Sequence, residues 1–286
     1  MQQPRGRSSG SAAHPARHRR LPFILVAVGL VVVVLLGAGF IWWNQRGPSQ
    51  PSIGGAVDRF RSSTHAPSDA AALQPPPGVY TYAGSGDEKL SFLATHQSED
   101  GDLPGTVTRG ADGCWTFAID YNTFHRQSWS RCAEAGRLVE HGNVSEQKFD
   151  FGALSQSERT EVVCEPATIL YDLAVAPGHR EQVRCTGHSQ TTNTNMTQRG
   201  QRTFIGRTTV VVGGTRVRAL HYAQDVKVSG DQTGSAHEEV WIAAKNGLPL
   251  REERTISVVS PAPAPLNHVT YSEHGRWQLT SLTPQK

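Results

Sequence analysis

The distribution of apolar residues divides the chain into three parts. Residues 21–43, "LPFILVAVGLVVVVLLGAGFIWW", contain no charged side chain. Residues 44–77 are rich in Pro, Ser, Gly and Ala. From Gly78 onward, short β-branched and aromatic runs alternate with Gly, Asn, Asp and Pro, a pattern typical of strands and turns. The chain therefore reads as an apolar helix, a linker and a β domain.

The apolar run predicts a transmembrane helix. A helix of this length rises about 35 Å, which exceeds the roughly 30 Å hydrocarbon core of a bilayer. Trp42 and Trp43 end the run, and aromatic rings favour the membrane interface. A cleaved signal peptide is the alternative, but its apolar region spans only about 7–15 residues and ends in a small-x-small cleavage site. The length and the two tryptophans favour an uncleaved signal anchor.

The charges on either side of the apolar run orient it. Residues 1–20 contain five arginines and no acidic residue, whereas a lone Arg46 follows the run. Positively charged flanks stay in the cytoplasm. We therefore expect a cytoplasmic tail at 1–20, a signal anchor at 21–43 and a single-pass protein of the cell membrane whose C-terminal part is extracytoplasmic.

The net charge of +3 belongs to the cytoplasmic tail and not to the β domain. The chain has 28 basic and 25 acidic residues, and without the five tail arginines 23 basic residues remain. A nucleic-acid-binding domain carries a basic patch, and the rest of this chain has no such excess. We therefore expect no nucleic-acid partner.

The remaining chain predicts a tether and one mainly β domain. A flexible segment as long as residues 44–77 spans about 30 Å on average, which suits a tether, although a short helix near 56–61 is an alternative for part of it. Residues 78–286 show almost no helical periodicity, and about 200 residues are enough for one sizeable core. We expect an extracytoplasmic domain of antiparallel strands with few helices.

The stretch "EEVWIAAKNGLPLREERTI", from Glu238 to Ile256, predicts a β-hairpin. Asn-Gly is strongly favoured in two-residue hairpin turns, so we place the turn at Asn246-Gly247. Glu239 then lies opposite Arg254. Because side chains alternate along a strand, one face of the hairpin carries Trp241, Ala243, Leu248 and Leu250. Pro249 cannot donate to a sheet, which indicates an edge or a bulge. Gly213-Gly214 predicts a similar turn in the same meander.

The four cysteines favour two disulfides, because an even number in an oxidising compartment is typical of disulfide-bonded proteins. Folding residues 114–132 about Thr123 places Cys114 opposite Cys132. The same register pairs Phe117 with Trp129 and Asp120 with Arg126. We therefore predict the bridge Cys114–Cys132 and, by elimination, Cys164–Cys185. A zinc site would need cysteines two to four residues apart, a spacing that this chain lacks.

Sequence motifs of catalysis are absent. The chain has no GxSxG, HExxH, Walker or dinucleotide-binding motif, and its twelve histidines show no paired metal-ligand spacing. We therefore expect no enzyme activity, no cofactor and no metal ligand.

The C-terminal hairpins resemble those of lipoprotein carriers of the LolA/LolB type. The similarity is carried by a Trp-containing strand followed by Gly-Leu-Pro-Leu-Arg, here Trp241 and residues 247–251. It covers about residues 200–280. The whole chain also resembles uncharacterised actinobacterial membrane-anchored extracytoplasmic proteins. The resemblance to the carriers implies a strongly curved antiparallel sheet, an open half-barrel, around an apolar cavity.

Three functions follow from these features. The first is a membrane-tethered binding module that holds a lipid or another apolar ligand of the cell envelope. Its candidate lining residues are one face of the strand at 114–121 and one face of the hairpin: Trp115, Phe117, Ile119, Tyr121, Trp241, Ala243, Leu248 and Leu250. The alternative is a scaffold that docks another envelope protein. A hydrolase with an unrecognised site is the third and least favoured reading.

Overall fold

The computed structural model describes residues 48–63, 73–91, 96–150, 155–172, 174–262 and 267–286. It contains one helix, α2 (Ile53–Ser62), within these ranges. The strands are β1 (Gly78–Leu90), β2 (His96–Ser98), β3 (Gly101–Arg109), β4 (Cys114–Asn122), β5 (His125–Glu134), β6 (Arg137–Asp150), β7 (Ser155–Tyr171), β8 (Arg180–Ser189), β9 (Thr194–Val212), β10 (Thr215–Gly230), β11 (Thr233–Ala243), β12 (Pro249–Pro261) and β13 (His268–Leu279). The predicted tail and signal anchor, residues 1–43, lie outside the described ranges. Within those ranges, no helix has the length and apolarity needed to cross a membrane.

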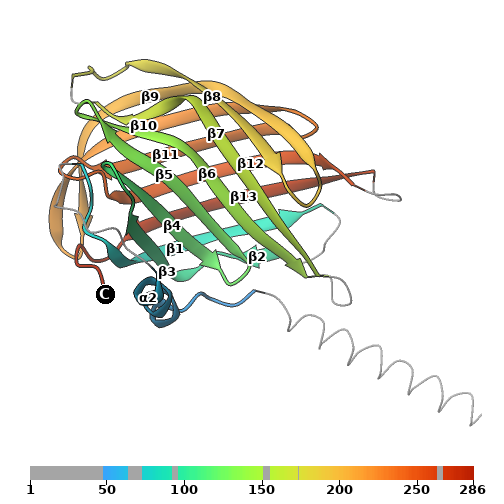
Figure 1. Ribbon diagram of the computed structural model, residues 1–286, viewed down its shortest axis with the longest axis horizontal. Coiled ribbons are helices and arrows are strands. Elements are labelled where there is room, and N and C mark those ends of the chain that lie inside the picture. Colours follow the sequence, from blue (N-terminus) through green and yellow to red (C-terminus); the bar gives the residue numbers. More distant parts are fainter. Residues whose placement is uncertain (1–47, 64–72, 92–95, 151–154, 173, 263–266) are drawn as a thin grey trace, which may run out of the picture. The chain divides into compact units, whose positions relative to one another are not determined.

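The strands form one antiparallel meander that closes on itself. From β3 to β13 each strand pairs with the next one along the chain, and consecutive strands lie side by side in Figure 1. The sheet closes because β13 also pairs with β1, from Tyr82 opposite Leu279 to Leu90 opposite Tyr271. The mainly β, antiparallel fold is confirmed. The expected open half-barrel is wrong, because the first and last strands share a complete ladder and leave no gap between them.

Short hairpin turns connect several of these strands, and one of the two predicted turns has another form. Gly213 and Gly214 have φ values of 52° and 81°, and Val212 pairs with Thr215, as predicted for a two-residue turn. The turn at Asn246-Gly247 is longer than predicted. The backbone amide of Ala243 donates to the carbonyl of Leu248, so four residues form the loop.

A β-bulge in this hairpin changes the predicted register. Trp241 lies opposite Arg251 and Ile242 opposite Pro249, so Leu250 is an extra residue on β12. The bulge confirms the expectation from Pro249. It also places Glu238 opposite Arg254 and Glu239 opposite Glu253, so the predicted pairing of Glu239 with Arg254 is wrong.

Aromatic side chains fill one part of the barrel interior. Trp115, Phe117, Ile119 and Tyr121 alternate along β4 and are each at most 1% exposed, so the prediction that they share one face is confirmed. The ring of Phe117 lies 5.7 Å from that of Trp129 and 5.8 Å from those of Tyr82 and Trp277. These contacts form a continuous aromatic core between β1, β4, β5 and β13.

Part of the range expected to be a tether is a helix packed on the barrel. Ser52 caps α2 by accepting a hydrogen bond from the amide of Gly55, which favours helix initiation there. Phe60, with Ala56 and Val57, packs against Val79 of β1. Arg59 forms an ion pair with Asp120 of β4. The expectation of a tether over all of 44–77 is therefore corrected for residues 53–62.

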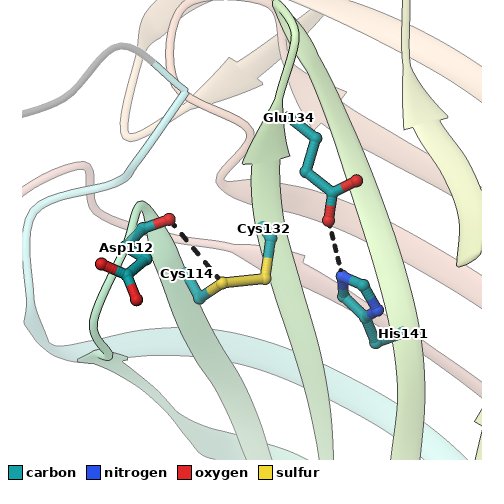
Figure 2. Close-up of a disulfide and its surroundings, with 5 residues drawn as sticks. All are labelled: Asp112, Cys114, Cys132, Glu134 and His141. Atoms are coloured by element: carbon teal, nitrogen blue, oxygen red, sulfur yellow. Dashed lines mark hydrogen bonds and ion pairs between the residues drawn. A yellow bond between two sulfur atoms is a disulfide. The ribbon is translucent and has the colours of Figure 1, made fainter.

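Both predicted disulfides are confirmed. Cys114 is bonded to Cys132 across β4 and β5, and Cys164 to Cys185 across β7 and β8. The predicted register of β4 and β5 is correct from Cys114–Cys132 to Asp120–Arg126, with Phe117 opposite Trp129. Beyond Asp120 a bulge places Asn122 opposite His125, so the predicted fold about Thr123 is wrong at the turn. Figure 2 shows the first bridge beside the ion pair of Glu134 and His141.

Candidate functional site

A network of ionisable side chains occupies the barrel interior next to the aromatic core. Its members on strands point inward because each alternates with an outward-facing neighbour along its strand. Each is at most 7% exposed. They are Glu88 of β1, Glu99 between β2 and β3, His125 and Arg131 of β5, Glu140 of β6, Arg202 of β9, Glu252 and Arg254 of β12, and Glu273 of β13.

Arg254 is the centre of the network. Its guanidinium forms an ion pair with the carboxylate of Glu273, and it donates to Glu99 Oε1 at 3.3 Å and to Gln127 Oε1 at 2.8 Å. It also donates to the hydroxyl of Tyr121 and lies 3.8 Å from the centre of that ring. Arg254 therefore fixes the positions of groups from four different parts of the chain.

Three carboxylates and one imidazole converge beside Arg254. Glu88, Glu99, His125 and Glu273 each offer one potential ligand atom, and these atoms lie within 4.8 Å of one another. His125 Nδ1 is hydrogen bonded to Glu88 Oε1, and it lies 3.9 Å from Glu99 Oε1. His125 Nε2 lies 3.3 Å from Ser145 Oγ. We call these four residues the carboxylate–histidine cluster.

Two glycines make room for Glu99. Gly86 of β1 lies opposite Gly275 of β13 where the barrel closes. A Cβ atom at Gly275 would lie 2.3 Å from Glu99 Oε2, and one at Gly86 would lie 2.9 Å from the same atom. Neither distance is sterically allowed, so the missing side chains create the space that this carboxylate occupies.

Burial shifts the protonation of the carboxylate–histidine cluster. Burial, followed by the negative charge of Glu273, raises the pKa of Glu88 to about 8 and that of Glu99 to about 9. Burial lowers the pKa of His125 to about 4, so its imidazole is neutral at pH 7. Neutral imidazole is the form that binds metal ions.

A second group of charges lies deeper among the aromatic rings. Arg131 Nε donates to Glu140 Oε2 at 3.1 Å, and Arg202 Nη2 lies 4.0 Å from Glu140 Oε1. The Arg131 guanidinium also stands 5.5 Å from the Trp115 ring. Burial, followed by the negative charge of Glu238, raises the pKa of Glu252 to about 8.

The network contains more carboxyl groups than guanidinium groups. Five of its members are glutamates and three are arginines. Burying an unpaired charge is costly, so the two extra carboxyl groups must be neutralised by protons or by a bound cation. This imbalance distinguishes the network from a set of structural ion pairs.

An outer groove is a weaker candidate site. It has a volume of about 1030 Å³ and is lined by α2 and by residues of β3 to β7. Several of its charged side chains pair with one another: Arg59 and Arg126 with Asp120, and Arg159 with Glu146. These pairs satisfy five of the groove's charged side chains, whereas Lys148 and Glu158, which also line it, belong to none of them.

Most of the lining residues predicted from the sequence belong to the packed core. Ala243, Leu248 and Leu250 are at most 3% exposed, as are the four β4 residues named above, and all seven belong to one apolar cluster. The prediction that Trp241 shares their face is wrong. Its neighbours Val240 and Ile242 point inward, and Trp241 stacks on His221 at 4.2 Å with Arg251 over its ring.

No protein-family model matches the sequence, and no curated protein matches it. The crystal structure of the hypothetical lipoprotein YmcC from Escherichia coli (K12) is similar over 72% of this chain and 85% of that one, at 13% sequence identity and a TM-score of 0.34. A similarity at this level carries no argument about function. The resemblance to lipoprotein carriers therefore stays a prediction.

Proposed function

We propose that this chain is a membrane-anchored, extracytoplasmic binding module that holds a small cation inside its barrel and has no catalytic role. The observation that carries the proposal is the surplus of buried carboxyl groups over guanidinium groups. A cation bound there would replace the protons that otherwise neutralise them. The anchor and the location rest on the charge and apolar pattern of residues 1–43.

An apolar ligand such as a lipid finds less support. The ring of Phe117, one of the expected lining residues on β4, lies 5.7–5.8 Å from those of Trp129, Tyr82 and Trp277. The rings of Tyr82 and Trp277 lie 5.0 Å from each other. Such spacing is that of a packed aromatic cluster. A lipid would have to displace these side chains from one another.

A scaffold function would use an exposed apolar patch. Among the residues that the structure describes, the large apolar side chains that are exposed are Val163, Ile205, Val211 and Leu282. Four aliphatic side chains are a less specific feature than the buried network. We therefore favour the binding function.

The proposal is tested by native mass spectrometry of the full-length protein in detergent. We expect a mass above that of the bare chain, lost on denaturation and reduced by Glu99→Gln. Glu253→Gln is the matched control, because Glu253 lies on the outer face and pairs with Arg251. A bare chain, or one that retains only an acyl lipid, would refute cation binding.

A further inference from the structure

We propose that Glu88, Glu99, His125 and Glu273 bind one divalent transition-metal ion, Zn²⁺ or Mn²⁺. This inference rests on the proposed function, because it names the cation. The four residues come from β1, the β2–β3 connection, β5 and β13, and each is at most 3% exposed. Their potential ligand atoms already lie within 4.8 Å of one another.

An unpaired oxygen of Glu88 independently points to a ligand. Glu88 is 2% exposed, and within the described part of the chain no nitrogen or hydroxyl group donates to its Oε2 atom; a side-chain hydrogen bond with Glu99 needs a proton on one of the two carboxyl groups. Its other oxygen contacts His125 Nδ1, so the unpaired atom belongs to the same cluster. A buried carboxylate oxygen without a partner is costly, and a bound metal ion would supply the missing interaction.

The set of donor atoms indicates the class of metal. Carboxylate oxygens suit Mg²⁺, Ca²⁺ and Mn²⁺, whereas imidazole suits Zn²⁺, Cu²⁺, Fe²⁺ and Ni²⁺. Three carboxylates with one imidazole therefore favour Zn²⁺ or Mn²⁺ over the alkaline-earth ions. When His125 Nδ1 binds the ion, Nε2 carries the proton of the neutral ring. Nε2–H can then donate a hydrogen bond to Ser145 Oγ, which lies 3.3 Å away.

The surroundings of the cluster orient the ligands and balance the charge. Arg254 contacts both Glu99 and Glu273, and the Tyr271 hydroxyl donates to Glu273 Oε2 at 2.5 Å. Such outer contacts fix the orientation of metal ligands. When the three carboxyl groups are ionised, they and the one guanidinium carry a charge of −2, which a divalent ion neutralises. The cluster therefore matches the charge of the ion as well as its preferred donors.

The test measures binding of Zn²⁺ and Mn²⁺ to the full-length protein in detergent after removal of metals with a chelator. Titration calorimetry should show one ion per chain. We expect His125→Gln and Glu88→Gln each to weaken binding by more than about 100-fold, because second-shell changes alone cost about 10–100-fold. Gly275→Ala, which crowds Glu99, should weaken it by about 10-fold or more without removing a ligand.

The matched control is His237→Gln. His237 also contacts two carboxylates, Asp225 at 2.7 Å and Glu239 at 3.7 Å, but it lies half-exposed on the outer face. This variant should bind the ion as the wild type does. Loss of binding in His237→Gln alone would place the ion on the outer face and overturn the inference.

A spectroscopic measurement covers the case in which a cluster variant fails to fold. Co²⁺ bound to the wild type should give weak visible absorption bands of oxygen and nitrogen ligation, which Zn²⁺ then abolishes. No saturable binding of Zn²⁺, Mn²⁺ or Co²⁺, or binding unchanged in folded His125→Gln, would overturn the metal site. If native mass spectrometry then found a different cation, the proposed function of cation binding would hold and only the transition-metal site would be wrong.

Discussion

Replacing Arg254 with methionine removes the guanidinium at the centre of the buried network while keeping a long side chain in the barrel. Glu99, Tyr121 and Gln127 each lose a hydrogen-bond donor, and Glu273 loses the cation of its ion pair. Because Arg254 is 2% exposed, water does not replace it freely. The carboxylates must then remain buried without their cation or take up protons.

The expected cost follows from this geometry. Removing one partner of a buried ion pair typically destabilises a protein by about 3–5 kcal/mol, because the other charge stays buried. Arg254 contacts two buried carboxylates, so we place Arg254→Met at the upper part of this range. Burial raises the pKa of Glu99 to about 9, and protonation of this group limits the cost.

Urea unfolding at pH 7 with a chelator present, followed by tryptophan fluorescence, measures this cost without a contribution from metal. Arg251→Met is the matched control on the same strand. Arg251 lies on the outer face, pairs with Glu253 and is 40% exposed, so its loss should cost less than about 1 kcal/mol. Equal costs for the two variants, or less than about 1 kcal/mol for Arg254→Met, would refute the central role of Arg254.

Four further predictions concern the disulfides, the pH dependence, the helix and the topology. The double variant Cys164→Ala/Cys185→Ala should lose about 2–4 kcal/mol in urea unfolding, and an unchanged midpoint would contradict a closed loop here. Burial raises the pKa of Glu252 from 4.5 to about 8. Between these pH values the folded chain holds a proton on Glu252 that the unfolded chain has lost, so the free energy of unfolding falls as the pH rises from 4.5 to about 8. Glu252→Gln should therefore raise the free energy of unfolding at pH 8 and change it little at pH 4; an equal effect at both pH values would exclude this linkage. Phe60→Ala should speed hydrogen exchange in α2 while the barrel stays protected, and slow exchange throughout the helix would show that its packing does not hold it. A reporter fused after Lys286 should be active outside the membrane, and cytoplasmic activity would reverse the predicted topology.

The register of β4 and β5 could be predicted because several residue pairs agree on it. The cysteines, the aromatic pair of Phe117 with Trp129, and the ion pair of Asp120 with Arg126 each fit the same alignment. The hairpin of β11 and β12 offered a turn motif and a single charged pair, Glu239 with Arg254, and no second pair agreed with it. The extra residue Leu250 shifts the register of this hairpin, and the alternation of apolar and polar residues does not reveal it. The only sign in the sequence was Pro249, which indicated an edge or a bulge.

Closure of the barrel and the buried network could not be predicted from local patterns. Both depend on β1 and β13, whose pairing involves residues far apart in the sequence. A partial signal existed in the adjacent charges Glu252 and Glu253, because one of two neighbouring side chains in a strand must point inward. The partners of such an inward charge come from distant strands, so the sequence could not identify Arg131 and Glu140 as groups that act on Glu252.

The pairing of β1 with β13 also determines the order in which the chain can fold. Each of the strands β3 to β12 pairs with the strand that follows it in the chain. Their hairpins therefore form from local contacts, and local contacts form quickly. One edge of β1 must wait for β13, and unpaired strand edges promote association with other chains. The end of β1 that pairs with β13 carries Asp87 and Lys89 beside Gly84 and Gly86. Charged and glycine residues are poor partners for another strand, so this edge is protected until the last strand arrives.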